Sequence, residues 1–162
     1  MPAKYSDEEI DRMLAEQKPL PDNYRSRVQL RRKRGHKESE LDVTGVNDTQ
    51  YRLILRQSNF NPLDFSIILA VNPPGSNQLF RLRRYNGKHG EHTNQIEGNT
   101  FYDFHIHQAT ERYQESGANE DAFAEPTDRY ADYHSALRCM IKDCGFEAPQ
   151  DAQQTLFGEF DS

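Results

Sequence analysis

The sequence has few cysteines and no long hydrophobic run, and both absences exclude classes of protein. Cys139 and Cys144 are the only cysteines, which excludes a disulfide-rich scaffold, and we interpret both as reduced thiols in or beside a helix. The longest apolar stretch, Phe65–Val71 (FSIILAV), has the length of a strand and is too short to span a membrane. The acidic beginning, MPAKYSDEEID, lacks the apolar region of a signal peptide. We therefore expect a cytoplasmic protein without membrane contact.

Hydrophobic residues are also scarce, at 35% of 162, whereas charged residues reach 28%. This composition predicts a thin core, with either a sheet that has one solvated face or a chain with disordered tails. The net charge of −6 is unevenly distributed, because residues 25–112 carry 14 Lys and Arg against 9 Asp and Glu, while both ends are acidic. A basic middle indicates an anionic partner. The alternatives are that the acidic ends fold back on it, or that all of it is solvated surface.

Helix and strand signals divide the chain clearly. Ser6 and Glu9 have the spacing of a capping box, which predicts a short helix that ends before Pro19. A stripe of apolar residues predicts a second helix over residues 129–144, stopped by Gly145. Alternating or apolar segments predict strands at residues 25–34, 38–43, 51–57, 65–71, 78–85 and 100–107.

Short turns between these strands favour an antiparallel arrangement. The predicted fold class is α+β: a strongly curved or barrel-like antiparallel sheet of about six strands, with a C-terminal helix and a short N-terminal helix. We divide the chain into an N-terminal helical arm (residues 1–24), a single α+β domain (25–146) and a flexible acidic tail (147–162). The arm either docks on the domain or binds a partner.

Histidines cluster in residues 87–107, which hold four of the six in the chain. In the strand predicted at 100–107, the period of two places Tyr102, Phe104 and Ile106 in the core. His105 and His107 then share the other face, roughly 7 Å apart at their Cα atoms. That spacing suits two imidazoles that bind one metal ion, or two groups that flank one phosphate. The simpler alternative is that His105 and His107 are exposed polar side chains that bind nothing.

The leading functional hypothesis is a nucleic-acid-acting protein, a metal-independent, ribonuclease-like phosphodiesterase that needs no cofactor. Two histidines supply a general base and a general acid at neutral pH, and arginines hold the phosphate. The catalytic candidates are His92, His105 and His107. The substrate-binding candidates are Arg56, Arg81, Arg83, Lys88 and Asn94.

A metal-dependent hydrolase is another hypothesis. A divalent metal would be held by His105 and His107, with His92 or Glu97 as the third ligand, and would keep an open position for water. The HxH element is suggestive but not specific.

A non-enzymatic binding protein is the main alternative to catalysis: an antitoxin-like protein, a phage-type inhibitor or an interaction module. Seven Lys and Arg residues lie within positions 25–37, and such a run contacts the backbone of RNA or single-stranded nucleic acid. It is equally typical of an edge strand kept soluble by charge.

The tail carries a short motif, QQTLF, in which Gln153, Leu156 and Phe157 have the pattern of peptides that dock on the bacterial DNA sliding clamp. A flexible peptide of this kind inserts two apolar side chains into a pocket. Docking of the same residues onto the parent domain is the alternative.

The blocks FRLRRYNGKHGEHTNQIEG, FHIHQATERYQ and DFSIIL resemble an uncharacterised family of small bacterial proteins. The resemblance covers roughly residues 25–146. It implies a bacterial, cytoplasmic, single-domain protein from mobile or defence-type loci, and it implies no particular activity or catalytic residues.

Overall fold

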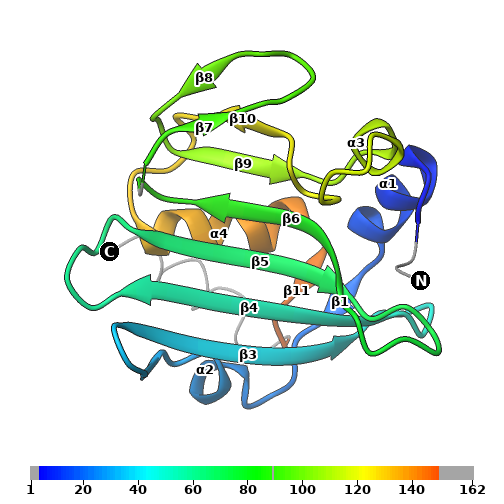
Figure 1. The fold of residues 1–162 in the computed structure, drawn as a ribbon. Coiled ribbons are helices and arrows are strands. Elements are labelled where there is room, and N and C mark those ends of the chain that lie inside the picture. The colour runs from blue at the N-terminus through cyan, green and yellow to red at the C-terminus, as the bar shows by residue number, and fades with distance from the viewer. Residues whose placement is uncertain (1–3, 89, 150–162) are drawn as a thin grey trace.

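A computed structural model describes residues 4–88 and 90–149, and its main feature is an antiparallel sheet of seven strands (Figure 1). From edge to edge the strands are β10 (Ala124–Pro126), β9 (His105–Gln108), β6 (Phe80–Asn86), β5 (Phe65–Val71), β4 (Gln50–Ser58), β3 (His36–Thr44) and β2 (Arg31–Arg32). The edge strands β10 and β2 do not pair with each other. Within the described residues the sheet is therefore open and is neither closed nor strongly curled, so the strongly curved or barrel-like form expected from the sequence is not found.

Two small strand pairs and four helices complete the described residues. β1 (Lys18–Pro19) pairs in parallel with β11 (Phe146–Glu147), and β7 (His92–Thr93) pairs with β8 (Thr100–Phe101) as a separate hairpin. The helices are α1 (Asp7–Ala15), α2 (Tyr24–Arg27), α3 (Glu111–Glu115) and α4 (Tyr133–Asp143). None of them has the length and apolar character needed to cross a membrane.

The N-terminal arm is part of the packed structure. The Ser6 hydroxyl accepts a hydrogen bond from Glu9 N, and the Glu9 carboxylate accepts one from Ser6 N, so the predicted capping box is confirmed. α1 buries Ile10 and Leu14 in the core. Because β1 then pairs with β11, the arm is also hydrogen-bonded to the segment that follows the last helix.

The C-terminal helix is confirmed with a later start. Asp132 is its N-cap and accepts a hydrogen bond from Ser135 N at 2.8 Å, so the helix begins at Tyr133 rather than near residue 129. Gly145 has a φ of +75°, the left-handed conformation that ends helices. Cys139 lies in α4 and Cys144 is its C-cap, and both are free thiols, as expected.

α4 and α1 cover one side of the sheet, which we call the helix face, while none of the described helices lies over the other side along β3 to β6 (Figure 1). We call that side the open face. β5 lies at the centre of the sheet and is buried along both faces, as its apolar run predicted. Alternate residues on each strand reach each face, so residue parity decides which side chains meet on the open face.

The prediction of a strand at residues 25–34 is wrong for most of that range. Residues Tyr24–Arg27 form the short helix α2, where Val28 N donates to Tyr24 O at 2.8 Å, and only Arg31–Arg32 pair with β3. Tyr24 is buried in the core and fixes this turn against the sheet. The weak alternation around Val28 could not outweigh that local packing.

The strand predicted at residues 100–107 is divided in two. Thr100 and Phe101 leave the main sheet to pair with β7, and pairing with β6 begins only at His105. Tyr102 therefore lies in the connection, 66% exposed, and its hydroxyl donates to Glu91 at 2.7 Å instead of entering the core. Ile106 is buried as predicted, and Phe104 packs partly buried against the core.

Candidate metal centre

β9 brings two histidines to the open face. His105 and His107 are two residues apart on this strand, and Ile106 between them enters the core on the helix face. The two imidazoles are nonetheless buried, with 2% and 4% of each residue exposed. The β7–β8 hairpin supplies the cover, since Phe101 and His92 both lie against His105.

His92 on β7 completes a cluster that we call the three-histidine centre (His92, His105 and His107). The ring centroids are 5.5 Å apart for His92 and His105, 4.8 Å for His92 and His107, and 4.9 Å for His105 and His107. One ring nitrogen from each residue lies within 4.8 Å of the others. The histidine cluster predicted from the sequence is therefore confirmed in space.

Hydrogen bonds on the far side of each ring select the tautomer. His105 Nδ1 and His107 Nδ1 lie 2.8 Å from the carbonyl oxygens of Asp103 and Asp121, and His92 Nε2 lies 2.9 Å from Asn94 Oδ1. Because these partners are acceptors, each of the three nitrogens carries the proton. In a neutral ring the other nitrogen then has a lone pair, which is the arrangement found in histidines that bind metals.

Asn86 supports this assignment for His105. The Asn86 Oδ1 accepts a hydrogen bond from Ser66 Oγ at 2.8 Å, which turns the amide nitrogen toward His105 Nε2 at 3.5 Å. An amide nitrogen is a donor, so His105 Nε2 is an acceptor, and a metal ion at this nitrogen would replace its long contact with Asn86.

Electrostatics keep His107 neutral. Burial, assisted by the positive charge of Arg84 and by His105, lowers the pKa of His107 to about 2. A neutral imidazole is the form that binds metal. A histidine that stays neutral at physiological pH is also poorly suited to act as a general acid.

The geometry suits a transition metal. Two imidazole nitrogens bound to tetrahedral zinc at about 2.0–2.1 Å lie about 3.4 Å apart, so small ring movements would bring these nitrogens into range. Imidazole ligands favour zinc, copper, iron and nickel over magnesium or calcium. Three protein ligands leave a further coordination position for water or substrate, as in catalytic zinc sites.

The arginine next to the centre is Arg84, which was not among the candidates. The pairing of β5 with β6 shifts register between Leu69 and Ala70, because Leu69 is opposite Arg83 whereas Ala70 is opposite Arg81. Beyond this bulge the alternation is displaced by one residue. Arg84 therefore lies on the open face, directly across from His107 on β9.

Arg81 and Arg56 also lie on the open face. Arg81 Nε is 3.1 Å from Glu120 and its Nη2 is 3.3 Å from Asp121. Arg56 is in the same cross-strand row as Ser66, Asn86 and His105, and it pairs with Glu38 at 3.4 Å. Both arginines thus have carboxylate partners.

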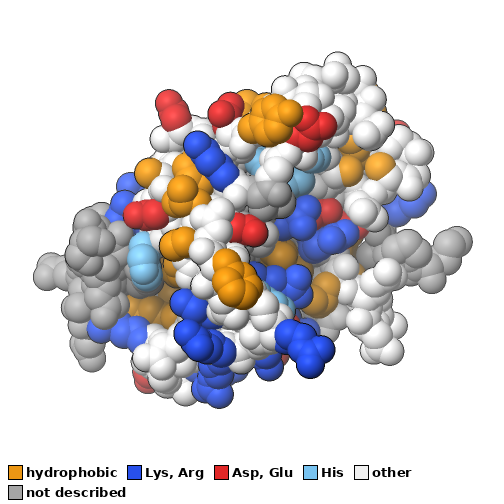
Figure 2. Space-filling view, turned by 60° about the vertical axis from the view of Figure 1, so that its left-hand side comes forward, with side chains coloured by type: hydrophobic (Ala, Val, Ile, Leu, Met, Phe, Trp, Pro, Cys, Tyr) orange, Lys and Arg blue, Asp and Glu red, His pale blue; other side chains and the backbone are white. Residues whose placement is uncertain are grey.

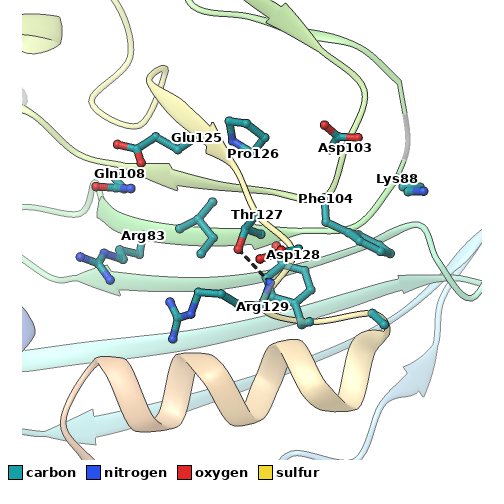
Figure 3. Close-up of a pocket in the computed structure, with 13 residues that line it drawn as sticks. Arg83, Lys88, Asp103, Phe104, Gln108, Glu125, Pro126, Thr127, Asp128 and Arg129 are labelled. Atoms are coloured by element: carbon teal, nitrogen blue, oxygen red, sulfur yellow. Dashed lines mark hydrogen bonds between the residues drawn. The ribbon is translucent and has the colours of Figure 1, made fainter.

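Arg83 and Lys88 lie away from the histidines, in a cleft of about 1020 Å³ on the helix face (Figure 3). Figure 3 shows Arg83 and Arg129 above α4, while Lys88 and Phe104 lie at the opposite end of the cleft. The Lys88 ammonium is 5.2 Å from the centre of the Phe104 ring. The structure does not bring these two candidates to the three-histidine centre.

The two remaining loop candidates hold the β7–β8 hairpin in place. The Glu97 carboxylate binds Arg112 and Tyr113 on α3, so it lies apart from the three histidines. Asn94 is 1% exposed, and besides holding His92 it exchanges two hydrogen bonds with the backbone of Ala124 on β10. Gln153, Leu156 and Phe157 lie outside the described residues.

Asn86, Arg84 and Asp121 are the site residues that sequence reasoning missed. Asn86 and Arg84 are identifiable only once the register between β6 and β9 is known. Asp121 lies in the loop before β10 and gave no signal in the sequence.

No family model, curated protein or solved structure matches the chain.

The hydrogen bond from His92 to Asn94 leads to a first prediction, about metal affinity. Replacing Asn94 with alanine removes the acceptor that orients His92, and it is expected to weaken zinc affinity about 10- to 100-fold. Competition with a chromogenic chelator measures the affinity. Gln95→Ala, an exposed neighbour, is the matched control and should bind zinc as the wild type does. Unchanged affinity in Asn94→Ala would show that ring packing alone orients His92.

Proposed function

We propose that the protein is a metal-dependent hydrolase whose three-histidine centre binds a divalent transition metal, with zinc the best fit. The convergence of three imidazoles, each with its second nitrogen held by an oxygen acceptor, carries this proposal. Three ligands from two separate structural units, β9 and the β7–β8 hairpin, also indicate a site that binding would complete and rigidify.

The chemistry expected at such a centre is hydrolysis. A zinc ion with three imidazole ligands lowers the pKa of a bound water toward 7. Held by His92, His105 and His107, the metal would supply a water activated for the hydrolysis of a phosphate or carboxylate ester. Figure 2 shows histidine side chains at the surface near the top of the molecule, with Lys and Arg side chains below them. His92 is the partly exposed member of the centre.

The metal-free phosphodiesterase has less support. It needs two histidines that share a proton cycle and reach the substrate. The pKa of His107 is far below the neutral range, so this residue would not supply a proton at neutral pH.

Metal content tests the proposal. Protein purified without a His-tag is expected to contain about one equivalent of zinc or another transition metal, or to take up one equivalent on titration. Removal of the metal by a chelator should abolish hydrolysis of a chromogenic phosphate ester, and added zinc should restore it. A protein that takes up no transition metal from an equimolar solution would contradict the proposal.

Binding of an anionic polymer such as RNA is the second candidate function. The exposed cations at positions 31–34 on β2 and the following turn favour it, and Figure 2 shows Lys and Arg gathered on the lower part of the molecule. Contact with a phosphate backbone makes affinity fall steeply with salt. RNA affinity that is independent of salt, or unchanged when Arg31 and Lys33 are replaced by alanine, would contradict it.

A further inference from the structure

On the open face, the three-histidine centre lies beside polar side chains of the neighbouring strands. Cross-strand pairing aligns His105 with Asn86 and Ser66, and the next row aligns His107 with Arg84. Side chains directly opposite each other on one face have Cβ atoms about 4.5–5.5 Å apart. None of the helices in residues 4–88 and 90–149 lies over this part of the sheet (Figure 1). A ligand on the open face beside His107 would therefore meet Arg84 first.

Arg84 has donor capacity that the described residues do not use. Its Nε is buried and makes no hydrogen bond there. Its ion pair with Asp121 is long, 3.7 Å between Nη2 and Oδ2, and that oxygen also lacks a hydrogen bond. The other Asp121 oxygen faces Arg81 at 3.3 Å. Buried guanidinium donors without acceptors are rare and costly, and they need an explanation.

A fixed cation beside a metal centre is unfavourable unless anions offset the charges, and Asp121, which is shared between Arg81 and Arg84, supplies only one negative charge. Arg84 and a divalent ion at His107 would repel each other across a short distance. An anion with one oxygen on the metal and a second on the guanidinium would neutralise both. A doubly charged phosphoryl group suits two adjacent cations better than a singly charged carboxylate, and the arginine fork matches its oxygens.

We propose that Arg84 and the open coordination position of the three-histidine centre together bind a phosphoryl group, so that the substrates are phosphate esters. This inference rests on the proposed function and specifies its substrate class.

Phosphate binding to the full-length protein loaded with Co²⁺ tests the inference. The visible absorption of Co²⁺ reports both metal binding and any change of its ligands when inorganic phosphate is added. Arg84→Met is expected to weaken phosphate binding about 10- to 100-fold, because a charge-assisted hydrogen bond is lost. The same variant should bind Co²⁺ as tightly as the wild type or more tightly, because a neighbouring positive charge has been removed.

Arg83→Met is the matched control, since Arg83 is adjacent in sequence but lies in the cleft on the helix face. It should leave phosphate binding unchanged. Arg84→Lys keeps the charge without the fork, and an intermediate loss is expected. This variant also provides the measurement if Arg84→Met does not fold.

The outcomes separate the two proposals. A wild-type protein that binds no Co²⁺ contradicts the proposed function itself. Co²⁺ binding with no response to phosphate, or with equal phosphate affinity in the wild type and the Arg84 variants, overturns this inference alone. Loss of Co²⁺ from Arg84→Met and Arg84→Lys would make Arg84 a support for His107 instead. Acetate that binds as tightly as phosphate would overturn the substrate class.

Discussion

His107→Ala is expected to lower zinc affinity by about 10³-fold, the largest effect on function predicted for a single substitution. The reason is that one of three metal ligands is removed from a buried position, where a water molecule does not replace an imidazole of matched geometry. His107 is also the histidine nearest to both partners, with ring centroids 4.8 Å from His92 and 4.9 Å from His105. Competition with a chelator of known affinity measures the loss.

Thermal unfolding supplies a second readout that does not depend on activity. A ligand that binds only the folded state at about 100 times its dissociation constant stabilises it by about 2.7 kcal/mol. For a chain of this size that corresponds to a rise in Tm of roughly 5–10 °C. Wild-type protein should show this rise with zinc, and His107→Ala should show none. Because His92 lies on the hairpin and His107 on the main sheet, zinc should also slow amide exchange in the hairpin.

His36→Ala is the matched control for this prediction. His36 lies on β3, with its side chain 40% exposed and paired with Glu38, and it is outside the three-histidine centre. Its replacement should leave both the zinc affinity and the zinc-dependent rise in Tm unchanged. Equal zinc binding by His107→Ala and the wild type would place the metal elsewhere.

The elements with strong local signals were predictable from the sequence. The capping box of Ser6 and Glu9 and the stop at Gly145 depend on neighbouring residues only, and both are present. The run Phe65–Val71 could only be a covered strand, and it is the central one. The period of two likewise placed His105 and His107 on one face.

The errors arise where distant contacts override the local pattern. An uninterrupted strand would place Tyr102 in the core. Because β8 pairs with β7 instead of continuing in the main sheet, Tyr102 is exposed to solvent. The choice of Arg83 over Arg84 follows from unbroken alternation, which the bulge in β6 displaces by one residue. A bulge depends on how two strands fit against each other, so neither strand's sequence reveals it.

In the candidate site, too, the local features were predictable from the sequence and the long-range contacts were not. His92 could be named because it lies in a histidine-rich loop, but its contact with the β9 histidines requires Asn94 to bind the backbone of β10, some thirty residues later. The carbonyl of Asp121 that orients His107 is also distant in sequence. Residue types were thus predictable, whereas the hydrogen bonds that turn three histidines into a metal centre belong to the tertiary structure.

Lys18→Met is expected to destabilise the fold by about 3 kcal/mol, the largest effect on stability predicted here. Lys18 is fully buried, and its ammonium donates to the carbonyl oxygens of Met13, Leu14, Glu16 and Cys144 at 2.6–3.2 Å. These carbonyls belong to the C-terminal ends of α1 and α4, where a positive charge is favourable. Methionine fills a similar volume but has no hydrogen-bond donor, so several buried carbonyl oxygens would lose their partner. Each lost partner costs about 1–3 kcal/mol of stability, and these costs are not strictly additive. Urea denaturation measures the difference, and Lys142→Met, exposed on α4, should change stability by less than about 0.5 kcal/mol.

The pH dependence of that difference shows whether the buried charge is responsible. Burial lowers the pKa of Lys18 from 10.5 to about 8. Between these values the unfolded chain binds more protons at this residue than the folded protein does, so the contribution of Lys18 to stability rises with pH. The deficit of Lys18→Met relative to the wild type should therefore be nearly constant below pH 8 and grow by up to about 1.4 kcal/mol per pH unit above it. A deficit that stays constant to about pH 10.5 and shrinks only above it would mean that the four carbonyls hold the ammonium strongly enough to raise its pKa above 10.5. A negligible deficit at every pH would mean that Lys18 does not join the two helix ends.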